Sequence, residues 1–238
     1  MAKQVKSKQR VADHGEVFTA EREVKAMCDL VADECLRIDS RFLEPACGDG
    51  NFLAEIISRK LSVVEAKYKK SKYDYERYSI LALTSIYGVD ILTDNVIRCR
   101  ERLYDIWNTC YSKICKSECN DETRKAACYI LENNIVCGNA LSMMCVVEFQ
   151  KDTEQYIVFP EWTFPFNDAR IKRRDFRLDV LLKENNDCEN YDGQFNLFSD
   201  DALDVEKWMI DPVTNELVPK PIQEYSVVSY RRLVEENG

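Results

Sequence analysis

The sequence predicts an α/β fold built on a doubly wound, mostly parallel sheet with helices on both faces. Three short apolar segments support this prediction, at residues 42–44, 87–91 and 135–141, and each lies beside glycine and a carboxylate or amide side chain. Stretches with the helical spacing of apolar residues separate them, which is the order that gives parallel strands joined by crossover helices. We therefore expect the three strand ends to meet at one edge of the sheet, where such folds bind ligands.

One main domain accounts for most of the chain. Its 238 residues lie within the ~250 that a single core fills. We expect an N-terminal helical segment at residues 1–40, the α/β core at 41–182, and an acidic loop with a C-terminal extension at 183–238.

The composition favours a soluble protein of the cytoplasm. No apolar run approaches the ~18 residues of a membrane helix, and the basic residues 1–10 lack the apolar stretch that follows in a secretory signal. The 11 cysteines are odd in number and several lie in apolar helical patterns, so we expect reduced thiols. With a single histidine and no C-x2-C spacing, no metal site is expected.

Residues 42–53 predict a strand, a glycine-hinged turn and the start of a helix. Gly48 and Gly50 lack a Cβ, so the backbone can take positive φ and approach a ligand, while the first N–H groups of the helix face outward. Glu44 and Asp49 would repel a pyrophosphate, and the Lys-Ser/Thr pair of a phosphate-binding loop is missing. A ligand with positive charge suits this turn better, and S-adenosylmethionine fits because its sulfonium and amino groups are cationic.

Ten consecutive residues of this region read Glu44-Pro45-Ala46-Cys47-Gly48-Asp49-Gly50-Asn51-Phe52-Leu53. This string resembles motif I of the amino-group DNA methyltransferases, especially the modification subunits of restriction systems. The resemblance implies a Rossmann-like methyltransferase fold and S-adenosylmethionine as the cofactor. It also implies that the cofactor is contacted by Glu44, Pro45, Ala46, Cys47, Gly48, Asp49, Gly50, Asn51 and Phe52.

An upstream loop resembles a second motif of the same family. The family has Gly-x-Phe-Thr-Pro where this chain has Glu16-Val17-Phe18-Thr19-Ala20. The resemblance implies that Phe18 and Thr19, in a loop of the N-terminal segment, contact the methionine part of the cofactor. Two structural roles remain open, because apolar spacing predicts a helix over residues 20–35 that Thr19 could cap and Phe18 could pack against.

The second predicted strand ends in a carboxylate. An acid at this place in a doubly wound sheet accepts hydrogen bonds from ribose hydroxyls, and the resemblance implies that role for Asp90, with Ile91 beside it. The alternative is that Asp90 caps the helix predicted over residues 94–114.

The third predicted strand ends in Gly138-Asn139-Ala140-Leu141, which resembles the Gly-Asp-Ala-Leu of the family. The family's aspartate accepts a hydrogen bond from the adenine amino group of the cofactor. Asn139 keeps an acceptor oxygen but lacks the charge. Asn139 and Ala140 therefore complete the predicted cofactor site.

The target-base motif departs from the family pattern. A fourth strand is expected at residues 155–159, where the family then has Asn/Asp-Pro-Pro-Tyr/Phe, whose polar side chain holds the target amino group and whose aromatic ring stacks on the flipped base. This chain has Pro160-Glu161-Trp162-Thr163-Phe164 instead. Glu161 as acceptor and Trp162 as stacking residue are the catalytic candidates, and a degenerate site is the alternative.

Partners can be inferred from charge. The net charge of −9 opposes binding to a polyanion, so DNA contact must be local or supplied by a second subunit. The cations Lys172, Arg173 and Arg174 are the candidate DNA-binding residues. No segment is large enough to form a second domain that reads a DNA sequence, so a separate specificity subunit is expected.

Two functions follow from these observations. The first is an adenine-specific DNA methyltransferase of a restriction-modification system, which acts with a DNA-reading partner. The second is a noncatalytic methyltransferase-like module that binds the cofactor or serves as a scaffold. The intact turn at residues 44–53 favours the first function, and the departure after Phe159 favours the second.

Overall fold

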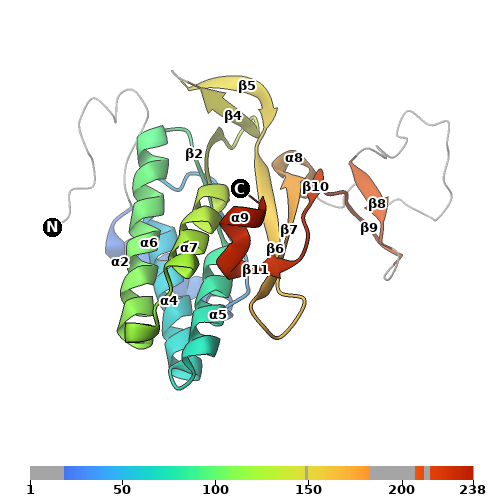
Figure 1. Ribbon diagram of the computed structural model, residues 1–238. Helices are drawn as coiled ribbons and strands as arrows, with labels where there is room; N and C mark the ends of the chain where they lie inside the picture. Colours follow the sequence, from blue (N-terminus) through green and yellow to red (C-terminus); the bar gives the residue numbers. More distant parts are fainter. Residues whose placement is uncertain (1–18, 148–149, 183–206, 212–214, 238) are drawn as a thin grey trace.

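The computed structural model describes residues 19–147, 150–182, 207–211 and 215–237 (Figure 1). The α-helices are α2 (Glu21–Leu30), α3 (Ala32–Cys35), α4 (Asn51–Tyr68), α5 (Lys72–Thr84), α6 (Thr93–Cys115), α7 (Asp121–Asn134), α8 (Leu178–Leu181) and α9 (Leu233–Asn237), with 3-10 turns η1 (Lys116–Glu118) and η4 (Tyr230–Arg232). The strands are β1 (Phe42–Glu44), β2 (Ile86–Asp90), β3 (Ile135–Asn139), β4 (Met144–Val147), β5 (Lys151–Tyr156), β6 (Val158–Thr163), β7 (Arg170–Arg177), β8 (Trp208–Ile210), β9 (Leu217–Pro219), β10 (Gln223–Glu224) and β11 (Val228–Ser229).

The first three strands lie side by side and parallel. Glu44 is in register with Gly88, and Asp90 is in register with Cys137. Helices α4 and α5 connect β1 to β2, and α6 and α7 connect β2 to β3. The predicted strands at residues 42–44, 87–91 and 135–141 are therefore confirmed to within a few residues.

The prediction of a mostly parallel sheet is wrong. The sheet runs β1-β2-β3-β4-β5, and only its β1–β2 and β2–β3 pairs are parallel, since β4 pairs antiparallel with both β3 and β5. Two further sheets, one of β6, β7, β10 and β11 and one of β8 and β9, are antiparallel. Residues 140–143 explain the change, because a parallel connection needs a dozen or more residues and so short a segment can only form a hairpin.

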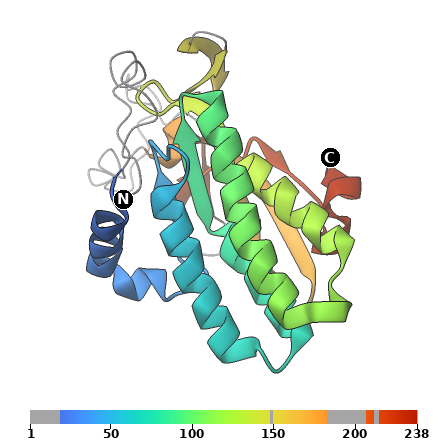
Figure 2. The same ribbon diagram turned by 90° about the vertical axis from the view of Figure 1, so that its left-hand side faces the viewer.

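Helices do not cover both faces of the parallel strands. Neighbouring residues of β2 point to opposite faces: a Cβ at Gly88 would lie 3.0 Å from Leu53 of α4, whereas the Tyr87 hydroxyl donates to the carbonyl of Pro160 in β6 at 2.8 Å. Figure 2 shows α4 and α6 in front of the parallel strands and β7 behind them. The second face is thus covered by the antiparallel β6–β7 pair, and the expectation of helices on both faces is wrong.

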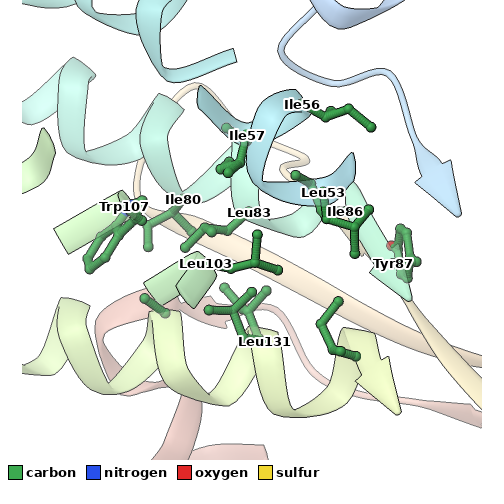
Figure 3. Packing of buried hydrophobic residues seen from close by; sticks show 14 of the residues in the cluster. Leu53, Ile56, Ile57, Ile80, Leu83, Ile86, Tyr87, Leu103, Trp107 and Leu131 are labelled. Atoms are coloured by element: carbon green, nitrogen blue, oxygen red, sulfur yellow. The ribbon is translucent and has the colours of Figure 1, made fainter. Parts of the chain in front are cut away.

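The hydrophobic core lies where α4, α5, α6 and α7 meet against β2 (Figure 3). Each helix contributes buried apolar side chains at intervals of three or four residues, which places them on one stripe. The largest of these include Leu53, Ile57, Ile80, Leu83, Leu103, Trp107 and Leu131. This packing fixes the helices that follow β1 and β2, and so fixes the turns between strand and helix.

The C-terminal residues belong to the same body as the core. Strands β10 and β11 pair with β7, and Tyr230 and Arg231 reach Glu76 of α5, whose side chain is buried. The Tyr230 hydroxyl donates to Glu76 Oε1 at 2.8 Å, and Arg231 Nη2 donates to the same oxygen at 2.6 Å. Tyr111 of α6 donates to the other oxygen at 2.5 Å, so this carboxylate joins three segments of the chain.

Candidate functional site

A cavity of about 620 Å³ lies at the carboxyl ends of β1, β2 and β3. Ligand pockets commonly measure roughly 300–1,000 Å³, so a nucleoside-sized molecule can be held here. Most of the predicted cofactor residues line it. The lining consists of Thr19, Glu44, Pro45, Ala46, Cys47, Gly48, Asn51, Phe52, Asp90, Ile91, Leu92, Asn95, Gly138, Asn139, Ala140 and Leu141.

The glycine turn joins β1 to α4 through two residues with positive φ. Gly48 has φ 54° and Gly50 has φ 86°, in the left-handed region that side chains disfavour. Gly50 also packs closely on α6, because a Cβ at this position would lie 2.7 Å from Cys99 Sγ. The residue before α4 is Gly50, which has no side chain. The first N–H groups of the helix are therefore not covered by a side chain from this position.

Asp90 connects the glycine turn to α6. Its Oδ2 accepts from the backbone N–H of Gly48 at 2.9 Å, and its Oδ1 accepts from Leu92 N at 2.8 Å and from Asn95 Nδ2 at 3.2 Å. Asp90 does not cap α6, because Leu92 occupies the cap position and no side chain caps the helix. A carboxylate has about four acceptor positions, so one position remains for a ligand hydroxyl.

Glu44 supplies negative charge at the end of β1. Burial raises the pKa of this carboxyl, and a hydrogen bond from Ala46 N at 3.4 Å opposes that rise. No cationic side chain of the described residues pairs with Glu44. A partly buried carboxylate in this situation gains from a positively charged ligand. The charge of Glu44 and the backbone geometry of the turn thus favour the same class of ligand.

Asn139 lies at the end of β3 with both ends of its amide engaged. Its Oδ1 accepts from Leu141 N at 3.1 Å, and its Nδ2 donates to Asp152 Oδ1 of β5 at 3.1 Å. The oxygen keeps one further acceptor position. The β4–β5 hairpin is therefore tied to the rim of the cavity through this amide.

Two residues of the predicted turn lie near the cavity without lining it. Asp49 faces α6, where its Oδ1 lies 3.5 Å from Arg102 Nη1, and Gly50 packs against the same helix. Phe18 lies outside the described residues. Thr19 is in the lining, but it does not cap α2, because Ala20 occupies the cap position and provides no side-chain hydrogen bond.

Sequence reasoning missed three residues of the lining, Leu92, Asn95 and Leu141, and named Gly138 only as part of the third strand end. Asn95 lies in the first turn of α6, close behind the end of β2, and could have been found from that position in the sequence. Gly138 has a different role, because a Cβ there would come within 2.5 Å of the Ile157 side chain. No local signal marks Leu92 or Leu141.

The catalytic candidates lie away from this cavity. Glu161 accepts from Arg41 at 2.8 Å and also binds Arg174; burial raises its pKa, but these two arginines outweigh burial and lower it. It lines a second cavity, of about 450 Å³, between β1 and β6–β7. Trp162 is 5% exposed, and its Nε1 donates to Asn134 Oδ1 at 2.8 Å.

The three candidate DNA-binding cations are each paired with a carboxylate of this chain. Lys172 donates to Glu224 at 2.9 Å, and Arg173 binds Asp175 at 2.6 Å with its side chain buried. Arg174 binds Glu161. Because neighbouring residues of β7 point to opposite faces, Arg173 does not share a surface with the other two.

Across the described ranges, no group of three or more His, Cys, Asp or Glu side chains could hold a metal ion, and no helix is long and apolar enough to span a membrane. Comparison with protein-family models, with curated proteins and with solved structures found no match for this chain.

Proposed function

We propose that this chain binds S-adenosylmethionine in the cavity at the ends of β1, β2 and β3, as part of an adenine-specific DNA methyltransferase whose DNA-reading element is a separate subunit. The observation that carries the proposal is the meeting of Glu44, the positive-φ turn at Gly48 and Asp90 in one cavity. Glu44 suits the cationic part of the cofactor. The free acceptor position of Asp90 suits a ribose hydroxyl.

The order of the strands supports one orientation of the proposed cofactor. β2 lies between β1 and β3, so Asp90 lies between Glu44 at one end and Asn139 at the other. The methionine part, with its two positive groups, belongs at the Glu44 end. The adenine belongs at the neutral Asn139 end, where an amide oxygen can accept from its amino group.

Methyl transfer needs little acid or base catalysis, because the sulfonium is already a strong electrophile. In-line positioning of the acceptor supplies roughly 7–11 kcal/mol at best. This chain would hold the donor, and the acceptor nitrogen must then be held at a fixed distance from the methyl group.

A second candidate is a noncatalytic, cofactor-binding module. It is favoured by the positions of Glu161 and Trp162, whose polar atoms are bound within the chain and lie outside the lining of the cofactor cavity. In this case the chain would sense the cofactor or support a partner, and the transfer step would be absent.

Titration calorimetry with S-adenosylmethionine tests the binding that both candidates share. We expect a dissociation constant between about 1 μM and 1 mM, which corresponds to about −8 to −4 kcal/mol. ATP is the matched ligand control, because it shares adenosine but brings phosphates toward Glu44. Absence of heat with S-adenosylmethionine at millimolar concentration, or tighter binding of ATP, would contradict the proposal.

A transfer assay separates the two candidates. Cofactor labelled with tritium in its methyl group is incubated with mixed-sequence DNA, with the chain alone and together with the products of neighbouring genes. Label in DNA that depends on this chain supports the methyltransferase. Binding of the cofactor without label in any mixture supports the noncatalytic module.

A further inference from the structure

A polar chain of contacts leads from α6 to the upstream loop across the glycine turn. Arg102 of α6 donates from Nη1 to Asn51 Oδ1 at 2.6 Å, and Asn51 Nδ2 lies 3.5 Å from the carbonyl oxygen of Thr19. Asn51 and Thr19 both line the cofactor cavity, whereas Arg102 lies behind the turn. The arginine therefore touches the wall of the cavity from outside.

The contact of Arg102 with Asn51 orients the amide. An asparagine amide can turn by 180° with little change in shape, which exchanges its oxygen and its nitrogen. With Arg102 donating to the oxygen, the nitrogen must face Thr19. Without the arginine, only the long contact of 3.5 Å with the Thr19 carbonyl oxygen favours that orientation.

Arg102 also interacts with a carboxylate of the glycine turn. Its Nη1 lies 3.5 Å from Asp49 Oδ1, and that oxygen is buried and accepts no hydrogen bond within the described residues. The pKa of Glu21 in α2 is lowered first by its hydrogen bond with Lys25, and the charge of Arg102 adds a smaller effect in the same direction. The direct contacts of Arg102 are thus with the turn, at Asn51 and Asp49.

We propose that Arg102 is a positioning residue of the cofactor cavity, which fixes Asn51 so that its amide nitrogen holds the Thr19 carbonyl at the cavity wall, beside the end that takes the amino-acid part of the ligand. The inference rests on the proposed cofactor site and assigns to it a residue outside its lining. Thr19 contacts Asn51, the first residue of the helix that follows β1, which places it on the β1 side of the cavity with Glu44. We therefore expect loss of Arg102 to affect the amino-acid part and to leave the adenosine part unchanged.

The test compares two ligands across four proteins. S-adenosylhomocysteine carries the amino-acid part and adenosine lacks it, and both are titrated into the full chain as wild type, Arg102→Gln, Arg102→Lys and Arg98→Gln. Arg98 is the matched control, since it lies one turn earlier on α6, is exposed and has no hydrogen bond or ion pair in the described part of the chain. Thermal unfolding of each variant shows that it is folded.

Arg102→Gln should weaken S-adenosylhomocysteine about tenfold, as expected for loss of one charge-assisted hydrogen bond, and adenosine by less than about twofold. Arg102→Lys should restore most of the loss, and Arg98→Gln should behave as wild type. Equal weakening of both ligands, or no weakening of either, overturns the inference while leaving cofactor binding intact. Failure of the wild type to bind either ligand removes the proposed function itself.

Hydrogen exchange gives a reading that needs no ligand. A peptide covering residues 19–28 should exchange about fivefold or more faster in Arg102→Gln than in Arg98→Gln, because the segment has lost a tether. Equal exchange rates in the two variants would contradict the role of Arg102. This holds even if the wild type binds the cofactor as the proposed function requires.

Discussion

At the scale of single residues, two carboxylates of the proposed cofactor cavity have different roles. Asp90 accepts hydrogen bonds from Gly48 N, Leu92 N and Asn95 Nδ2, and these bonds occupy most of its acceptor positions. In the described part of the chain, Glu44 accepts only one long hydrogen bond, from Ala46 N. Asp90 therefore fixes the conformation of the turn, whereas the charge of Glu44 is available to a ligand.

Replacing Asp90 with alanine should weaken S-adenosylmethionine by about 1–3 kcal/mol, since the ribose loses an acceptor and the Gly48 N–H loses its partner. Calorimetry measures this loss. Asp105→Ala, an exposed site on α6 away from the cavity lining, is the control and should bind as wild type. An unchanged dissociation constant for Asp90→Ala would exclude the ribose role.

Cofactor affinity should fall as the pH is lowered from 7 to 5. Burial raises the pKa of Glu44 above 4.5, so this carboxylate gains its proton at a higher pH than an exposed one and then no longer attracts a cation. The α-amino group of the ligand, with an ordinary pKa of about 7.7–8.0, stays charged over this range. Glu44→Gln should bind weakly at pH 7 and show little further change, and the same slope in that variant would place the titrating group elsewhere.

At the scale of secondary-structure elements, the C-terminal segment is held by charge as well as by strand pairing. Arg231 and Arg232 are neighbours in the sequence with different partners. Arg231 binds the buried Glu76, whereas Arg232 binds Glu235 on the surface. Exposed pairs contribute about 0–1 kcal/mol, and hydrogen bonds to a buried charge contribute more.

Arg231→Gln should therefore lower the free energy of unfolding by about 1–3 kcal/mol, with the value reduced because the arginine itself is 40% exposed. Arg232→Gln should change it by less than about 0.5 kcal/mol. Urea denaturation of the two variants beside the wild type measures both. Equal effects of the two substitutions would show that Glu76 does not hold the C-terminal segment.

The elements also show what could be predicted from the sequence. The turn after β1 and the end of β2 could be predicted from two short segments, Glu44 to Leu53 and Tyr87 to Ile91. In both, the conformation depends on glycines or a strand-end acid and on the residues next to them. The chain after β3 depends on distant contacts. Residues 155–159 read as one strand, yet the chain changes sheets at Ile157, whose N–H donates to Met143 O at 2.8 Å and whose side chain fills the space beside Gly138.

The pairing of Glu161 could not have been predicted for the same reason. Its partners are Arg41, before β1, and Arg174, on the neighbouring strand β7. No local pattern relates these three residues, since their contact follows from the packing of β6–β7 over β1 and β2. The three cations at 172–174 likewise form one run in the sequence but lie on two faces of a strand.

At the scale of the whole molecule, charge makes a separate DNA-binding partner necessary to the proposed function. The chain carries a net charge of −9, and Lys172, Arg173 and Arg174 are neutralised by Glu224, Asp175 and Glu161. Binding to phosphates releases counterions only where cations are free to make contact. These three cations therefore contribute little to the electrostatic part of DNA affinity.

Fluorescence anisotropy with a labelled duplex should give a dissociation constant weaker than about 100 μM for the isolated chain at physiological salt, at or beyond the weak end of non-specific binding. The double variant Lys172→Gln/Arg174→Gln should not differ from wild type, because its two cations are already paired. Micromolar binding that weakens in this variant and falls steeply with salt would instead make β7 a DNA-contacting strand. A neighbouring gene product that confers micromolar binding on the mixture, but only when the chain is present, would supply the partner that the charge balance requires.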